Sequence, residues 1–357
     1  MAIDTTFLKE LVEMPSVTGT EWRAAELVRQ RLADVADEID TDVMGSVHAR
    51  LDGVSKEAPT VLIAAHMDEI GLMVHYISDE GFLSVSAVGG VDAGLLPGLR
   101  VDVHAADGPI RGVVGRMPIH LVPADERKNV APIDKLCIDT GLPADEVKER
   151  IRIGDTITYG VGFEPFGKNL AVSRAFDDKA GVFIGVRVME ELAARAERPQ
   201  ASYVLAATVQ EEIGLRGGET SAFSVNPTVA LGFDVTHATD YPGIEKSKFG
   251  DIKLGGGPVI ARGPNINPVV FDRLVAAAEA EGIAYQIEAE PRVTGTDAGS
   301  MQVQRGGIAT GLVSLPLRYM HTPTEVVSLE DAEGCIKLLA RFIADLDPAT
   351  TFIPGMQ

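Results

Sequence analysis

Residues 59–68 read PTVLIAAHMD, an uninterrupted apolar run that ends abruptly at His66 and Asp68. A run this short and this apolar is typical of a β-strand buried on both faces, as in the centre of a parallel sheet. Three later stretches have the same character, namely Tyr203–Val209, Thr228–Phe233 and Ile308–Leu315. The pattern therefore predicts four buried strands.

Helical patterns separate the later strands. Apolar residues recur at helical spacing in Gly181–Arg195, Phe271–Glu281 and Leu329–Leu346. Two further helices are expected near the N-terminus, one capped by Thr5 or Thr6 and one from about Glu21 to Ala36. Strands that alternate with such helices favour an α/β fold, with a mostly parallel central sheet flanked by helices.

The stretch from about Gly71 to Gly167 has a different composition, rich in Gly, Pro and short alternating runs. Leu99–Val103 and Ile110–Val114 flank a turn signal and predict a β-hairpin, and Thr156–Tyr159 predicts another strand. We therefore expect residues 71–167 to form an inserted, small β-barrel-like domain. The α/β domain would then comprise residues 1–70 and 168–357.

Composition narrows the range of partners and compartments. The 357 residues include 52 acidic and 32 basic ones, a net charge of −20, so a nucleic acid would be repelled. The N-terminal residues lack a secretory pattern, and no apolar run approaches the ~20 residues that span a bilayer. We expect a soluble cytoplasmic protein that binds neither nucleic acid nor membrane. Cys137 and Cys335 are expected to be buried and not disulfide-bonded.

Each of the four predicted strands leads into a side chain that can bind a metal ion. In chain order these candidates are His66, Glu212, Asp234 and His321, and Asp177 precedes a predicted helix. The carboxyl ends of parallel strands share one edge of a sheet, so the five side chains should converge. Imidazole and carboxylate ligands without thiolate suit zinc, cobalt or manganese. Two imidazoles and three carboxylates suffice for two ions if one carboxylate bridges them.

Six segments carry a resemblance to a known family. They are AAHMDEIG (64–71), SRAFDDKAG (173–181), VQEEIGLRGG (209–218), LGFDVTHATDYPG (231–243), VTGTDAGSMQ (293–302) and PLRYMHTPTEVV (316–327). Together, and in this order, they resemble the M42 family of aminopeptidases, within the wider clan of co-catalytic metallopeptidases. The resemblance covers essentially the whole chain. It implies a catalytic α/β domain and an inserted β-domain used for dimerisation.

The resemblance also assigns roles to individual residues. It implies that His66, Asp177 and Asp234 hold one divalent ion and that Asp177, Glu212 and His321 hold a second, with Asp177 bridging. Glu211 would be the general base, and Asp68 would orient His66. A cis peptide bond is expected between Asp177 and Asp178.

The implied activity is removal of N-terminal residues from short peptides, in dimers that assemble into a tetrahedral dodecamer. Three alternatives remain at this point: an endoglucanase-like glycoside hydrolase, a non-catalytic assembly protein, and a carboxypeptidase or deacylase of a neighbouring two-metal family. The preferred N-terminal residue and the physiological metal are not predicted.

Four other polar residues allow two interpretations each. His237 and Asp240 either line the mouth of the site or are ordinary loop residues. Asp297 either caps a helix or lies near the substrate's N-terminus. Arg318 either stabilises a carboxylate or substrate carbonyl, or forms an ordinary salt bridge.

Overall fold

The protein, described over residues 3–356 by a computed structural model, is built around an 11-stranded sheet within that range. Its central strands lie in the order β12–β3–β13–β16 and are parallel to one another. The strands of the main path, in spatial order, are β1 (Glu38–Thr41), β2 (Val47–Leu51), β12 (Ser202–Thr208), β3 (Thr60–His66), β13 (Val229–His237), β16 (Ala309–Arg318), β17 (Glu325–Ser328), β11 (Leu170–Ser173) and β10 (Glu164–Phe166). The remaining pair is β14 (Val259–Arg262) and β15 (Gln286–Ala289).

Strand β3 illustrates why these apolar runs form the centre of the sheet. Its alternate residues Val61, Ile63 and Ala65 belong to the larger hydrophobic core, together with buried side chains of α1, α2, α4 and α9. Leu62 and Ala64 belong to a second core on the opposite face, with side chains of α5 and α8. Because successive side chains point to opposite faces, a strand covered on both sides must be apolar throughout. The predicted central strands are confirmed.

The edges of the sheet depart from the parallel arrangement. Strand β2 pairs with β12 in the antiparallel sense, and β17 and β14 both pair antiparallel with β16. The prediction of a mostly parallel sheet therefore describes the centre and not the flanks. Two central strands also extend further than predicted, β13 to His237 and β16 to Arg318.

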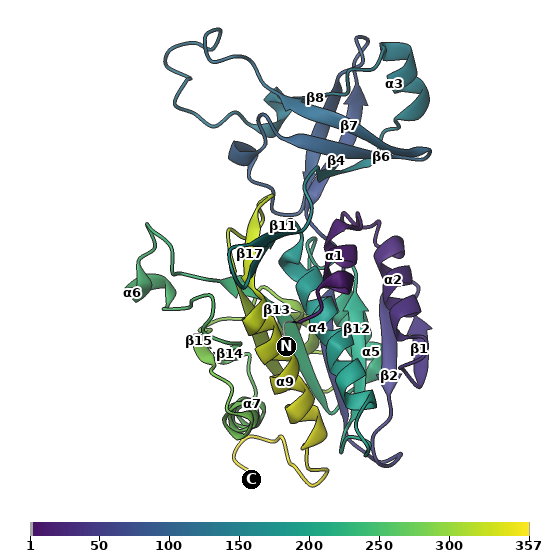
Figure 1. The fold of residues 1–357 in the computed structure, drawn as a ribbon, viewed down its shortest axis with the longest axis vertical. Helices are drawn as coiled ribbons and strands as arrows, with labels where there is room; N and C mark the ends of the chain where they lie inside the picture. The colour runs from purple at the N-terminus through teal and green to yellow at the C-terminus, as the bar shows by residue number, and fades with distance from the viewer. Residues whose placement is uncertain (1–2, 357) are drawn as a thin grey trace.

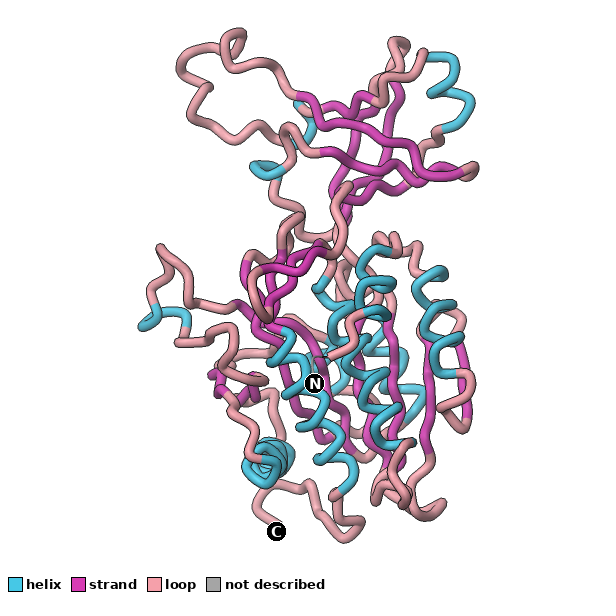
Figure 2. The backbone as a smooth tube through the Cα atoms, in the orientation of Figure 1, coloured by secondary structure: helices cyan, strands magenta, loops and turns pink. Residues whose placement is uncertain are grey.

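Helices cover both faces of the sheet, as Figures 1 and 2 show. Two of them have clear start signals. Asn267 caps α7 by accepting hydrogen bonds from the backbone N–H groups of Val269 and Val270, and Ser328 caps α9. The helices are α1 (Thr6–Glu13), α2 (Trp22–Leu32), α3 (Ala144–Arg150), α4 (Phe176–Ala193), α5 (Arg216–Val225), α6 (Lys246–Phe249), α7 (Pro268–Glu281), α8 (Asp297–Met301) and α9 (Leu329–Ala344), with short 3-10 turns at Ala93–Leu95 and Ile133–Lys135.

A closed β-barrel stands at one end of the sheet, at the top of Figure 1. It has its own hydrophobic core, which includes Leu72, Val101 and Ile157. The predicted hairpin is confirmed, because β6 and β7 pair antiparallel as far as Ala105 and Gly108. The barrel strands in spatial order are β4 (Gly71–Ile77), β5 (Leu83–Val88), β8 (Cys137–Asp139), β7 (Gly108–Gly115), β6 (Arg100–Ala105) and β9 (Thr156–Tyr159). The fold class predicted from the sequence, including the barrel, is confirmed.

Two further predictions concern the burial of the cysteines and the presence of membrane-spanning helices. Cys137 and Cys335 are both free, but only Cys335 is buried, whereas Cys137 at the start of β8 is half-buried. The expectation that both are buried is wrong for Cys137, because side chains alternate along β8 and it is the next residue, Ile138, that lies in the barrel core. No helix within residues 3–356 has both the length and the apolarity to cross a membrane.

Candidate metal centre

The carboxyl ends of the central strands gather the predicted ligands. His66 is the last residue of β3, and Asp234 lies in β13. Pairing between β3 and β13 ends at Ala64 and Gly232, two residues before these side chains. Open α/β sheets form their sites at this edge, where neighbouring strands separate.

The other predicted residues come from the adjoining loops and one helix. Glu211 and Glu212 follow β12, and His321 follows β16. Asp177 occupies the first turn of α4, and its peptide bond to Asp178 is cis, as predicted.

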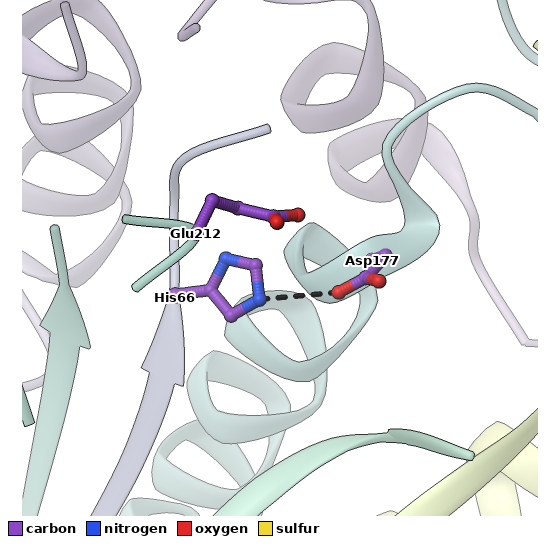
Figure 3. Close-up of side chains that lie close together, drawn as sticks. All are labelled: His66, Asp177 and Glu212. Carbon is purple, nitrogen blue, oxygen red and sulfur yellow. Dashed lines mark hydrogen bonds and ion pairs between the residues drawn. The ribbon is translucent and has the colours of Figure 1, made fainter. Parts of the chain in front are cut away.

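The Asp177 carboxylate lies between the two histidines. Its Oδ1 is 3.1 Å from His66 Nε2, and its Oδ2 is 3.2 Å from His321 Nε2. Glu212 also reaches this group, because its Oε1 lies 3.4 Å from His321 Nε2. Figure 3 shows His66, Asp177 and Glu212 converging, with the contact between His66 and Asp177 dashed. One carboxylate oxygen therefore faces each imidazole.

Two compact groups of donor atoms share His66. One comprises His66, Asp177 and Glu212, and the other comprises His66, Glu211 and Asp234, each with its donor atoms within 4.8 Å of one another. Together with His321, which lies 3.2 Å from Asp177 and 3.4 Å from Glu212, these groups contain every residue of the predicted ligand set. The grouping differs from the sequence assignment, because the two groups share His66 instead of Asp177 and do not include His321. Glu211, the predicted base, stands beside Asp234 and His66.

Asp68 is fully buried and contacts three parts of the site. Its carboxylate accepts hydrogen bonds from the backbone N–H groups of Glu211 at 3.1 Å and Glu212 at 3.2 Å. Its backbone carbonyl lies 3.0 Å from His66 Nδ1, and its own Oδ1 lies 3.5 Å from that nitrogen. Asp68 therefore holds the two glutamates as well as flanking His66, whereas the sequence had suggested the histidine alone.

Two supporting groups around His321 were not predicted. The Glu325 carboxylate accepts hydrogen bonds from the backbone N–H groups of Asp177 at 3.2 Å and His321 at 3.0 Å. Gly90 lies in the chain between β5 and β6, and its backbone carbonyl oxygen is 3.2 Å from His321 Nδ1. Glu325 could have been suspected, because it stands four residues after His321 in the PLRYMHTPTEVV segment. Gly90 carries no such signal.

A buried ionic cluster behind the site was also missed. Glu69 forms ion pairs with Arg174 and, at 2.8 Å, with Lys179 Nζ, and all three side chains are buried. Burial opposes ionisation of Glu69, but the charges of Arg174 and Lys179 lower its pKa to about 2. The cluster connects Glu69 to Arg174 and Lys179, which lie before and after Asp177 in the chain. It therefore links the segment that contains His66 to the segment that contains Asp177.

The electrostatics of the site favour the binding of a cation. Burial, supplemented by the charges of nearby carboxylates that include Asp234, raises the pKa of Glu211 to about 9. Burial likewise raises the pKa of Asp234 well above its ordinary value. Buried Asp178 Oδ2 has no hydrogen-bond partner within residues 3–356. So many buried carboxyl groups ionise readily only beside cations, and imidazole with carboxylate is a donor set that divalent ions accept. The residues present therefore fit a divalent metal centre.

A cavity of about 450 Å³ opens onto this centre. Its lining includes Asp177, Glu211, Glu212, Asp234 and His321. A cavity of this size accommodates a small ligand such as one amino-acid residue of a peptide. The candidate centre is thus accessible from solvent.

The contacts of His237, Asp240, Asp297 and Arg318 decide between some of the alternative roles that the sequence allowed. His237 lines the cavity, whereas Asp240 forms a two-pronged ion pair with Arg318, with contacts of 2.7 and 2.6 Å. The salt-bridge interpretation of Arg318 is therefore the correct one. Asp297 is not the N-cap of α8, because that position is Thr296 and Asp297 is the first residue of the helix. It is buried and accepts a hydrogen bond from Thr208 Oγ1 at 2.8 Å.

Comparison with known proteins matches residues 45–338 to the family model of the M42 glutamyl aminopeptidases. Over 350 residues the chain is 36% identical to the lysyl aminopeptidase of Pyrococcus furiosus, covering 97% of this chain and 98% of that protein.

Solved structures give the same result. The TET aminopeptidase of a marine-sediment thaumarchaeote superimposes with a TM-score of 0.90 at 31% identity, covering 96% of each chain. The TET1 peptidase of Pyrococcus horikoshii, which can assemble into a tetrahedron or a large octahedral shell, gives a TM-score of 0.84 at 30% identity, covering 95% of this chain and 99% of that one. A Thermotoga maritima protein described as an endoglucanase also matches, with a TM-score of 0.76 at 30% identity, covering 94% of this chain and 96% of that one.

Proposed function

This chain belongs to the M42 family of aminopeptidases, and on that premise we propose that it removes N-terminal residues from short peptides with two divalent metal ions per subunit. The observation that carries the proposal is the position of Asp177, with one carboxylate oxygen 3.1 Å from His66 and the other 3.2 Å from His321. A carboxylate that faces two imidazoles in this way has the geometry of a bridging ligand.

The proposed ligand set is the one that the family resemblance implies, and the contacts of Asp177 with His66 and His321 support it. His66, Asp177 and Asp234 would hold one ion, and Asp177, Glu212 and His321 would hold the other. Zinc or cobalt suits this mixture of imidazole and carboxylate, and manganese is a third candidate. Bound ions of this kind polarise a carbonyl group, lower the pKa of water and stabilise negative charge in the transition state.

Glu211 is proposed as the general base. Its carboxylate lines the cavity, is only 8% exposed, and has its Oε2 3.8 Å from His66 Nε2. Its backbone is fixed by the hydrogen bond to Asp68. From this position Glu211 would take a proton from the attacking water and donate it to the nitrogen of the leaving amine as the peptide bond breaks.

The excess of carboxylates in the cavity suits a substrate whose free terminus is an ammonium group. A peptide entering with that terminus first presents a cation to a negatively charged pocket. An endopeptidase or a glycosidase substrate carries no such charge next to the bond that is cleaved. The cavity therefore favours aminopeptidase action over the glycoside hydrolase alternative.

Substitution of the base tests the proposal. The Glu211→Gln variant should bind the same two ions per subunit as wild type but lose about 100-fold to 10,000-fold in turnover of aminoacyl anilides. Glu57→Gln, an exposed glutamate before β3, is the matched control and should behave as wild type. Removal of the ions by a chelator should abolish activity, and zinc or cobalt should restore it. Cleavage of cellulose in place of aminoacyl anilides would contradict the proposal.

We also propose that residues 1–70 and 168–357 form the catalytic domain and that residues 71–167 mediate dimerisation, with dimers assembling into a dodecamer. The segment between β7 and β8 exposes Met117, Ile119, Leu121 and Val130, which are 58%, 44%, 71% and 64% exposed. Several exposed apolar side chains on one segment suit a contact surface. This segment forms the long loop at the top left of Figure 2.

Light scattering tests this assembly. Wild type should have the mass of a dimer or of a dodecamer, and the Leu121→Asp variant should have a smaller mass. A wild-type mass equal to one subunit at micromolar concentration would contradict it. The cytoplasmic location remains a prediction.

A further inference from the structure

We propose that the cavity selects peptides whose N-terminal residue is lysine or arginine, because Glu288 and Glu290 present carboxylates to that side chain. The inference rests on the proposed function and adds to it the class of substrate. Both glutamates line the cavity that opens onto the candidate metal centre. They come from β15 and the residue that follows it, more than fifty positions beyond Asp234 in the chain.

The position of Glu288 relative to the metal centre fits a long side chain. Its carboxylate accepts a hydrogen bond from Thr236 Oγ1, with distances of 2.9 and 2.8 Å to its two oxygens. Thr236 lies two residues after Asp234 on β13, so both side chains point to the same face, about 7 Å apart along the strand. The four-carbon stem of lysine extends over a comparable distance. An N-terminal residue with its ammonium group near the metal centre would therefore bring its side-chain cation to Glu288.

The two carboxylates have no cationic partner in the described part of the protein. No lysine or arginine is among the described residues that line the cavity, and neither Glu288 nor Glu290 forms an ion pair within residues 3–356. Arg318 is paired with Asp240, and Arg262 on the neighbouring strand β14 stacks over the Phe271 ring at 5.2 Å. Burial, with the charge of Glu290 adding to it, raises the pKa of Glu288. A cationic ligand would supply the charge that this carboxylate lacks.

The rest of the cavity complements the stem of such a side chain. Leu215, Leu312 and Met320 contribute apolar surface to the lining. Lysine and arginine bury an apolar stem while their charged end reaches a polar partner. A glutamate side chain in the same cavity would face two like charges, and a leucine side chain would leave both carboxylates without a partner. The arrangement therefore discriminates both for cationic residues and against acidic ones.

A panel of aminoacyl anilides tests the inference on the full-length, metal-loaded enzyme. We expect kcat/KM for the Lys and Arg substrates to exceed that for Leu by about tenfold or more, with the Glu substrate lowest. In Glu288→Gln the ratio of Lys to Leu kcat/KM should fall by about 10-fold to 100-fold, and in Glu57→Gln it should not change. The amide oxygen of the Glu288→Gln variant can still accept the hydrogen bond from Thr236, so the substitution removes the charge alone. Glu288→Arg should reverse the order and favour the Glu substrate over Lys.

Inhibition by free amino acids gives a second readout that does not depend on turnover of a charged substrate. With the Leu anilide as reporter, L-lysine should inhibit wild type at a concentration about tenfold lower than L-norleucine, which has the same stem without the ammonium group. The difference should disappear in Glu288→Gln. Cleavage of the Leu substrate without a preference for Lys or Arg would overturn this inference and leave the aminopeptidase proposal intact. Failure to cleave any aminoacyl anilide would overturn the proposed function itself.

Discussion

Substitution of Gly90 by alanine would disturb the candidate metal centre through His321, without changing any charged residue. A Cβ atom at position 90 would lie 2.8 Å from His321 Nδ1 and 3.1 Å from its Cε1. An ordinary contact begins at 3.4 Å, so the ring must move by about 0.6 Å, the difference between 3.4 and 2.8 Å. The backbone at Gly90 does not have a positive φ, so alanine adds no conformational strain of its own.

The imidazole of His321 has little freedom to absorb this movement. Its Nε2 faces Asp177 at 3.2 Å and Glu212 at 3.4 Å, and its backbone N–H donates to Glu325. Displacing a metal-binding histidine from its supporting contacts typically costs about 10-fold to 100-fold in metal affinity or activity. We expect a loss of that size for Gly90→Ala.

The assay compares kcat/KM on an aminoacyl anilide, metal content and thermal stability in Gly90→Ala and Gly306→Ala. Gly306 is the matched control, because a Cβ there meets no described atom within 4 Å and its φ is not positive. Gly90→Ala should lose activity or metal with an almost unchanged Tm, and Gly306→Ala should resemble wild type. Wild-type kcat/KM and full metal content in Gly90→Ala would refute the assigned contact between Gly90 and His321.

Two further predictions concern acids that the sequence did not single out. Glu325→Gln replaces an acceptor of two backbone N–H groups by an amide with only one acceptor oxygen. We expect kcat/KM to fall by about 10-fold to 100-fold. A variant with wild-type kinetics would exclude a positioning role for Glu325. Glu69→Gln leaves Arg174 and Lys179 buried without their shared anion, and should lower the free energy of unfolding by about 3–5 kcal/mol at neutral pH in urea titrations. Because burial beside two cations lowers the Glu69 pKa from 4.5 to about 2, its stabilisation is fully present above pH 4.5 and is lost as the pH falls through 2. The difference between wild type and Glu69→Gln should therefore narrow as the pH falls through this range, and a difference that does not depend on pH would contradict the ion-pair account.

The sequence was informative wherever local pattern and strand polarity sufficed. Four apolar runs identified the centre of the sheet, and the rule that sites form at the carboxyl ends of parallel strands brought His66, Asp234 and His321 to one edge. The turn chemistry of residues 99–114 likewise predicted a hairpin that the structure contains.

What the sequence did not reveal depends on partners far away in the chain. The periodicity of a strand indicates which residues are buried but not which strand lies beside it, so the antiparallel flanks were not predicted. Gly90 contributes a backbone carbonyl, which any residue carries, and Glu69 follows Asp68 in a segment where only the contacts reveal their different roles. Glu288 and Glu290 belong to the cavity only because β15 pairs with β14, and β14 pairs with β16.

The central claim is that Asp177 bridges two ions, and anomalous diffraction from crystals grown with zinc or cobalt tests it most directly. Data collected on both sides of the metal's absorption edge should give two peaks per subunit, about 3.5–4 Å apart, each beside one oxygen of Asp177. His66 and Asp234 should flank one peak, and Glu212 and His321 the other. A single peak, or two peaks that Asp177 does not connect, would contradict the account.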